Sequence, residues 1–222
     1  RFDSLGHSYI PALQARTAVG RRFGPGEHLE PSMAVIIDPD AKSWSGHYMA
    51  YNEKLSRQLE ADGMAVEVLC RRDLDEGIIS ERKNYHPTFT RHSWQIGNPK
   101  AHLEHAVEFE KELIAGIEQV VAKYKGQVLL YMYCGGIEHA EILKRVASRF
   151  DRLIVNVNLF WLSFRLTPQY VELRRPFLER LDSEVGLGHF IATTPTEELR
   201  NRLAELTAVV LPVAPHPSTG IS

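Results

Sequence analysis

Cysteine, charge of one sign and long apolar runs are all scarce in this sequence, and each scarcity excludes a class of protein. The two cysteines, Cys70 and Cys134, are too few for a disulfide framework and both end apolar runs, so we expect free, mostly buried thiols. A formal net charge of -2 provides no broad basic field for binding nucleic acid. No apolar run reaches the roughly 18 residues of a membrane span, and residues 1–10 lack a signal-peptide core. We predict a cytoplasmic protein with small-molecule partners, no nucleic acid and no transmembrane segment.

Several enzyme signatures are also missing. The Gly24-Pro25-Gly26 patch precedes the first expected strand, so it is not a dinucleotide-binding fingerprint. The sequence contains no Walker A lysine loop and no G-x-S-x-G elbow. His102 and His105 have the i, i+3 spacing of a helical metal pair, but neighbouring glutamates indicate a solvated helix face and no third ligand follows. We therefore disfavour a dehydrogenase, an ATPase or an esterase, and we expect neither a metal nor a covalently bound cofactor.

What the sequence does contain is a regular alternation of short apolar runs and helical patterns. Its 222 residues, 44% hydrophobic and 24% charged, suit one globular domain. We expect strands at 33–37, 65–69, 128–133, 153–157, 190–193 and 209–211, with helices at about 45–62, 100–123, 137–150, 169–181 and 196–206. This order predicts an α/β fold, a single Rossmann-like domain with a doubly wound parallel sheet and helices on both faces. It spans residues 33–217, after a leader arm at 1–32 and before a tail at 218–222, and carries an irregular insert at 71–99.

Polar and glycine residues follow the expected strands, and ligands of open parallel sheets bind beyond the carboxyl ends of the strands. The candidate substrate-binding residues are Asp38, Lys42, Trp44, Gly135, Gly136, Asn158 and Thr193. Ser45 and Gly46 are candidate cofactor-binding residues, because the amides that begin a helix can bind a phosphate or a sugar hydroxyl. Each of them could instead end a strand or cap a helix. Their concentration at one edge is what favours a binding site.

Two side chains at this edge are candidate catalytic groups. His47 lies in the first turn after a glycine, where a helix N-terminus favours its neutral form. Glu138 and His139 follow a Gly-Gly turn, and because adjacent helical residues do not face one way, we favour Glu138. Either residue could alternatively serve only in packing.

The segments 45–51, 135–139, 190–199 and 209–215 resemble, in that order, the N-terminal domain of bacterial GT-B glycosyltransferases of the group 1 type. In residues, the first two read Ser45-Gly46-His47-Tyr48-Met49-Ala50-Tyr51 and Gly135-Gly136-Ile137-Glu138-His139. The similarity covers about Met33 to Pro217. It implies an acceptor-binding half that works with a C-terminal donor-binding domain, and a donor substrate that is a UDP- or GDP-linked nucleotide-sugar. The acceptor would be a saccharide or a lipid-linked saccharide, and this chain would not catalyse transfer alone.

Under this resemblance, Gly46 and His47 would lie near the donor, while Glu138, Asn158 and the 71–99 insert would shape the acceptor side. Two alternatives stay open. The chain could be a non-catalytic sugar-binding or regulatory module, because a fold does not fix a function. It could also be a small-molecule enzyme of another α/β class that uses His47, Asp38 and Glu138 as acid-base groups.

Overall fold

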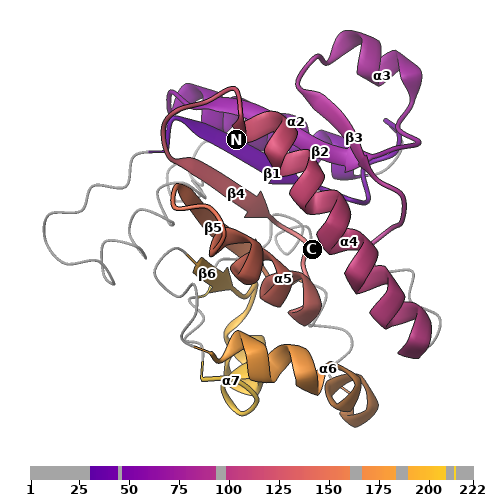
Figure 1. Cartoon of the computed structure of the whole chain (residues 1–222), viewed down its shortest axis with the longest axis vertical. Helices are drawn as coiled ribbons and strands as arrows, with labels where there is room; N and C mark the ends of the chain where they lie inside the picture. Colours follow the sequence, from indigo (N-terminus) through magenta and orange to yellow (C-terminus); the bar gives the residue numbers. More distant parts are fainter. Residues whose placement is uncertain are drawn as a thin grey trace, which may run out of the picture.

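Six parallel strands form one sheet in the order β3-β2-β1-β4-β5-β6. The computed structural model describes residues 31–44, 47–93, 99–160, 167–183, 190–208 and 213. The strands are β1 (Met33–Ile37), β2 (Ala65–Arg71), β3 (Tyr85–Phe89), β4 (Val128–Met132), β5 (Leu153–Asn158) and β6 (Phe190–Thr193). The helices are α2 (His47–Ala61), α3 (Glu76–Glu81), α4 (Pro99–Val121), α5 (Ile137–Ala147), α6 (Pro168–Leu181) and α7 (Glu197–Ala204) (Figure 1). The predicted Rossmann-like α/β fold is confirmed.

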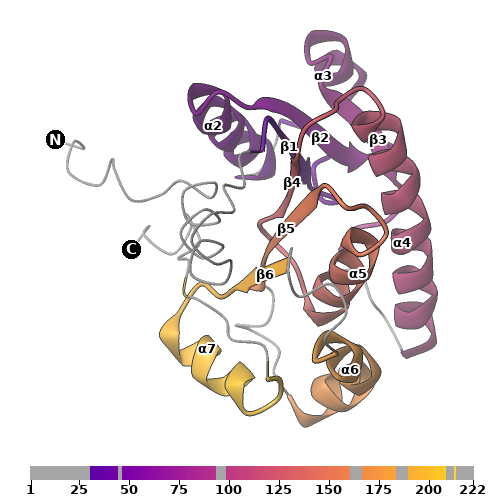
Figure 2. The same cartoon turned by 60° about the vertical axis from the view of Figure 1, so that its left-hand side comes forward.

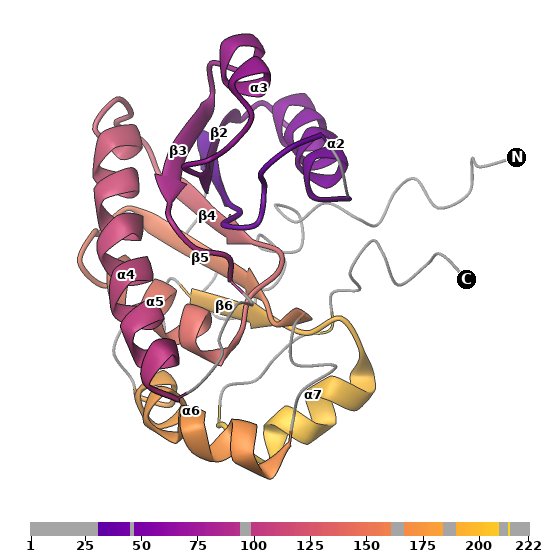
Figure 3. The same ribbon diagram turned by 90° about the vertical axis from the view of Figure 1, so that its right-hand side faces the viewer.

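The helices form two layers, one on each face of the sheet. Figures 2 and 3 show α2 on one face and α4 with α5 on the other. Successive strand residues point to opposite faces, so each strand supplies two cores. Ala34 and Ile36 join the core beneath α2, whereas Met33, Val35 and Ile37 join the core beneath α4 and α5. Strands that are buried on both faces explain the continuous apolar runs of the sequence.

The segment 71–99 is not the irregular insert that the sequence suggested. It contains α3 and the edge strand β3, which pairs with β2. An edge strand buries less apolar surface and tolerates proline. Because β3 contains Pro87 and is polar in composition, the sequence pattern did not predict it as a strand. His86 of β3 also contacts Glu67 of β2, with 2.6 Å between the ring Nε2 and the carboxylate. Of the other predicted segments, 209–211, 1–30 and the tail 218–222 lie outside the described residues.

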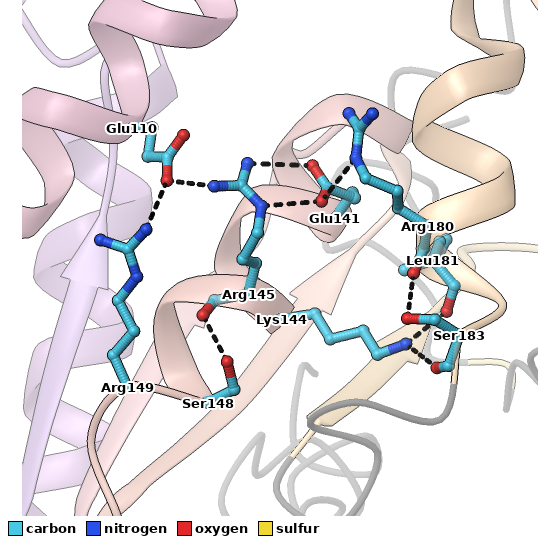
Figure 4. Close-up of polar contacts among 9 residues, drawn as sticks. All are labelled: Glu110, Glu141, Lys144, Arg145, Ser148, Arg149, Arg180, Leu181 and Ser183. Carbon is cyan, nitrogen blue, oxygen red and sulfur yellow. Dashed lines mark hydrogen bonds and ion pairs between the residues drawn. The ribbon is translucent and has the colours of Figure 1, made fainter.

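A charged network joins helices α4, α5 and α6 (Figure 4). Arg145 of α5 donates to Glu110 of α4 and, at 2.9 Å, to Glu141 of its own helix. Arg180 of α6 donates to the same Glu141 oxygen at 3.0 Å. The Lys144 ammonium donates to the carbonyl oxygens of Leu181 and Ser183, where α6 ends and has unpaired carbonyls. These contacts fix the helix layer against which the strands pack.

Candidate functional site

The strand order places a topological switch point between β1 and β4, because the chain leaves β1 toward β2 on one side and later fills the other side with β4, β5 and β6. In open α/β sheets, ligands bind at such a point, outside the carboxyl ends of the strands. Asp38 follows β1 and Tyr133 follows β4, so both stand at this edge.

The Asp38 carboxylate is the centre of a buried hydrogen-bond cluster. One oxygen accepts from the backbone amides of Asp40 and Ala41, at 3.0 and 3.1 Å. The other accepts from the Asn52 side-chain amide of α2 at 2.7 Å and from the Tyr133 hydroxyl at 2.5 Å. Four donors hold both oxygens, so Asp38 organises the loop after β1 and ties it to α2 and β4.

Asp40 joins a second loop to the same edge. Its carboxylate accepts from the backbone amide of Ser93 at 2.9 Å and from the Ser93 hydroxyl. The His92 ring nitrogen lies 3.4 Å from it. Burial raises the pKa of both Asp38 and Asp40 to about 6, and the neighbouring Asp40 adds to the rise at Asp38. The two carboxyl groups therefore titrate near neutral pH.

Polar side chains occupy one face of the sheet near its carboxyl edge, and apolar side chains occupy the other. On the α2 face, β4 and the residue after it supply Tyr131 and Tyr133, β5 supplies Asn156 and Asn158, and β6 supplies Thr193. All five are buried. On the opposite face, the intervening residues are Met132, Val157 and Ala192, which belong to the other core. We call Asp38 and these five residues the polar row.

The side-chain oxygen of Asn156 in the polar row is buried and has no hydrogen-bond partner among the described residues. Asn156 lies beside Tyr131 of β4 and Ile191 of β6. Buried polar groups in proteins almost always have a partner, which can be water or a ligand. A molecule that carries hydroxyl donors would satisfy this oxygen.

Gly135 lets the chain turn tightly against β5. Its backbone amide donates to the Asn158 carbonyl at 2.8 Å, and a Cβ at this position would lie 2.6 Å from a methyl group of Val157. Gly136, the next residue, is the N-cap of α5 and its amide donates to the His139 ring nitrogen at 3.0 Å. Both glycines thus lie at the edge where the sequence placed them.

Glu138 lies at the start of α5 in a buried ion pair. Arg174 of α6 donates to both carboxylate oxygens, at 2.9 and 3.3 Å, and its guanidinium stacks over the Tyr170 ring. This contact gives the predicted catalytic residue a structural partner. His139 packs edge-on against Phe109 of α4. His105 is buried beside the same ring, so its predicted place on a solvated face is wrong, because α4 turns that side toward α5.

The structure does not place the other predicted site residues in the polar row. Lys42 forms an ion pair with Asp73 at 3.2 Å. Trp44 lies apart from the polar row, in a groove on the outer side of α2. His47 begins α2, and its side chain, like Ser45 and Gly46, lies outside the described residues. Cys70 and Cys134 are free and buried, as predicted, and burial raises the pKa of the Cys70 thiol to about 12.

Several residues of the site were not predicted from the sequence. Tyr131 and Tyr133 have the i, i+2 spacing of one strand face, and this signal was available in the sequence. Asp40 follows Asp38 closely and could also have been found. Asn52 and Arg174 come from helices, and no spacing in the sequence links them to their partners.

The fold and the site together define a Rossmann-like α/β domain with polar side chains at the carboxyl edge of its sheet. Searches against protein-family models and curated proteins find no match. Among solved structures, the chain is similar to the N-terminal domain of trehalose-6-phosphate phosphatase from Candida albicans, with a TM-score of 0.50 and 13% identity. The match covers 85% of this chain and 45% of that chain, so this chain spans less than half of its length. Similarity at this level shows the fold alone. In the described ranges, no helix has the length and apolarity to cross a membrane.

Proposed function

We propose that this domain binds a saccharide at the polar row, as the acceptor-side half of a glycosyltransferase that uses a nucleotide-sugar donor. The observation that carries the proposal is the polar row itself, which places hydroxyl and amide groups on one face of neighbouring strands at the switch point. Sugar hydroxyls both donate and accept hydrogen bonds, and such neutral groups suit them. The order of the GT-B-like segments in the sequence supports the same class.

The charges of the edge favour a neutral acceptor over a nucleotide. Asp38 and Asp40 lie close together at the edge, and their ionised forms would repel a diphosphate. We therefore assign the donor to a separate domain of the parent enzyme. The similar solved domain comes from a protein named for a phosphorylated sugar, which agrees with carbohydrate chemistry but rests on the fold alone.

The test is a calorimetric titration of the purified chain with a panel of saccharides, UDP, GDP and nucleotide-sugars. We expect at least one saccharide to bind, and nucleotides to bind at least about tenfold more weakly. Asn156→Leu keeps the branched shape of the side chain but removes the buried acceptor, so it should weaken saccharide binding about tenfold. Asn201→Leu makes the same chemical change on exposed α7 and should have no effect.

Three outcomes would reject the proposal. Tight nucleotide binding by the chain would move the donor site into this domain. Saccharide binding that Asn156→Leu leaves unchanged, in a variant whose thermal unfolding is normal, would move the saccharide away from the polar row. Turnover by this chain alone would favour a single-domain enzyme instead.

A further inference from the structure

A groove on the outer side of α2 lies outside the polar row. Its α2 residues recur three and four positions apart, so they form the exposed stripe of the helix, opposite the buried stripe that contains Met49, Leu55 and Leu59. Trp44, in the loop after β1, and Arg82, just after α3, line the rest of the groove. The groove encloses about 590 Å³ and is lined by Trp44, Ala50, Glu53, Lys54, Arg57, Gln58 and Arg82.

Trp44 gives the groove an aromatic wall. Trp44 is 49% exposed, and of the described residues only Leu103 and Val107 are other large hydrophobic residues that are this exposed. The Arg82 guanidinium carbon lies 5.9 Å from the Trp44 ring centroid, within cation-π distance. An exposed indole of this kind offers a flat apolar surface on which the C–H face of a ring can stack.

The rest of the groove is positively charged. Arg82 donates to the Glu53 carboxylate at 2.8 Å, and Arg57 lies 3.6 Å from the same oxygen. Glu53 is only 16% exposed in its side chain, whereas Arg57 is 78% exposed. Lys54 adds a third cation to the lining. One recessed carboxylate thus holds two guanidinium groups near each other without neutralising the groove.

We propose that this groove binds a sugar phosphate, with the sugar ring stacked on Trp44 and the phosphate between Arg57 and Arg82. Guanidinium groups bind phosphate oxygens through charge-assisted hydrogen bonds, and two of them next to an aromatic wall match a charged group that is carried on a ring. The volume of the groove is in the range of small-molecule sites. This inference goes beyond the proposed function and does not depend on it.

The test uses the full chain and glucose 6-phosphate as the probe, followed by calorimetry or by ligand-observed NMR at fixed ionic strength. We expect saturable binding that Arg57→Gln and Trp44→Ala each weaken at least about fivefold. The matched controls are Arg72→Gln and Val107→Ala, an exposed arginine and an exposed apolar residue that line a separate cavity on α4. Both controls should bind the probe as the unmodified chain does.

Glucose and inorganic phosphate, tested separately, should each bind at least about tenfold more weakly than the sugar phosphate, because each uses only half of the groove. Phosphate binding as tight as that of the sugar phosphate would reject the stacked ring. Tighter binding of AMP would reject a sugar as the stacked group, and no saturable binding would reject the site. Asn156→Leu should leave sugar-phosphate binding in the groove unchanged. A failure of the groove proposal can therefore be distinguished from a failure of the proposed saccharide site at the polar row.

Discussion

Buried carboxylates at the carboxyl edge and between the helices are stabilised in opposite ways. Asp38 and Asp40 are hydrogen-bonded by hydroxyl, amide and backbone groups, and burial raises their pKa to about 6. Burial also opposes ionisation of Glu141, but hydrogen bonds from Arg145 and Arg180 outweigh it and lower its pKa. Glu141 is thus held by two arginines, whereas the hydrogen bonds to Asp38 and Asp40 come from neutral donors.

This difference separates a buried carboxylate whose pKa is lowered from buried carboxyl groups whose pKa is raised. A buried carboxylate that is paired with arginine stays ionised and fixes the distance between two helices. A buried carboxyl group that is held by neutral donors changes protonation near neutral pH, so its hydrogen-bonding character responds to what binds nearby. The edge therefore has the properties expected of a ligand-facing region, and the helix layer those of a support.

The largest expected effect comes from breaking the pair between α5 and α6. Glu138→Ala leaves the Arg174 guanidinium buried without its carboxylate, which should lower the free energy of unfolding by about 3–5 kcal/mol. Urea denaturation at pH 7 measures this loss. Glu172→Ala breaks only an exposed pair with Arg175 and serves as the control, with no measurable change expected.

A double variant sharpens this first prediction. Glu138→Leu with Arg174→Met removes both charges and keeps apolar volume, so it should recover most of the stability that Glu138→Ala loses. A loss below about 1 kcal/mol in Glu138→Ala would contradict a desolvated pair. Glu138 would then be accessible at the edge, and its predicted catalytic role would gain support.

The second effect is a pH dependence of opposite sign in the two regions. The pKa of Asp40 is higher in the folded chain than its ordinary value of 3.8, so the folded state binds more protons between pH 4 and 6 and loses stability as the pH rises through that window. A shift of two pKa units corresponds to about 3 kcal/mol. Asp40→Asn can keep the hydrogen bonds to Ser93 but does not titrate. Between pH 4 and pH 7, the free energy of unfolding of this variant should therefore rise relative to that of the unmodified chain, by up to about 3 kcal/mol.

Glu141→Gln should behave in the reverse way. The lowered pKa of Glu141 adds stability above its ordinary value of 4.5, and this stability disappears as the pH falls through the lower folded value. The variant should therefore be less stable than the unmodified chain at pH 7 and approach it in acid. Denaturation series from pH 3 to 8 measure both variants, and parallel curves for the two would refute the contrast.

Much of the fold could be predicted because the buried strands have a strong signal. The bounds of β1 and β6, Met33–Ile37 and Phe190–Thr193, agree with the sequence prediction, since each is a short apolar run between polar residues. The strand β3 was missed because it lies at the edge and contains Pro87. Propensity identifies strands that are buried on both faces, and it fails where one side of a strand is exposed.

The candidate site could be predicted only in part, because its hydrogen bonds join residues that are far apart in the sequence. Asp38 was placed at the edge correctly by its position after a strand, but its donors Asn52 and Tyr133 lie 14 and 95 residues away. Trp44 was predicted with the same edge, whereas the structure places it in the groove with Arg82. Position after a strand predicts the edge, and only packing decides which neighbours meet there.

The smallest expected effect tests the neutral donors of the edge directly. Tyr133→Phe removes the hydroxyl that donates to Asp38, and Asn52 still donates to the same oxygen, so the loss should be about 1–2 kcal/mol. That hydrogen bond lowers the pKa of Asp38, so its loss should raise this pKa further and extend the pH-dependent window above pH 6. NMR titration of the Asp38 carboxyl carbon measures the shift. A loss as large as that of Glu138→Ala, with no change in titration, would mean that the edge depends on Tyr133 for packing, and the contrast between a supporting and a responsive region would fail there.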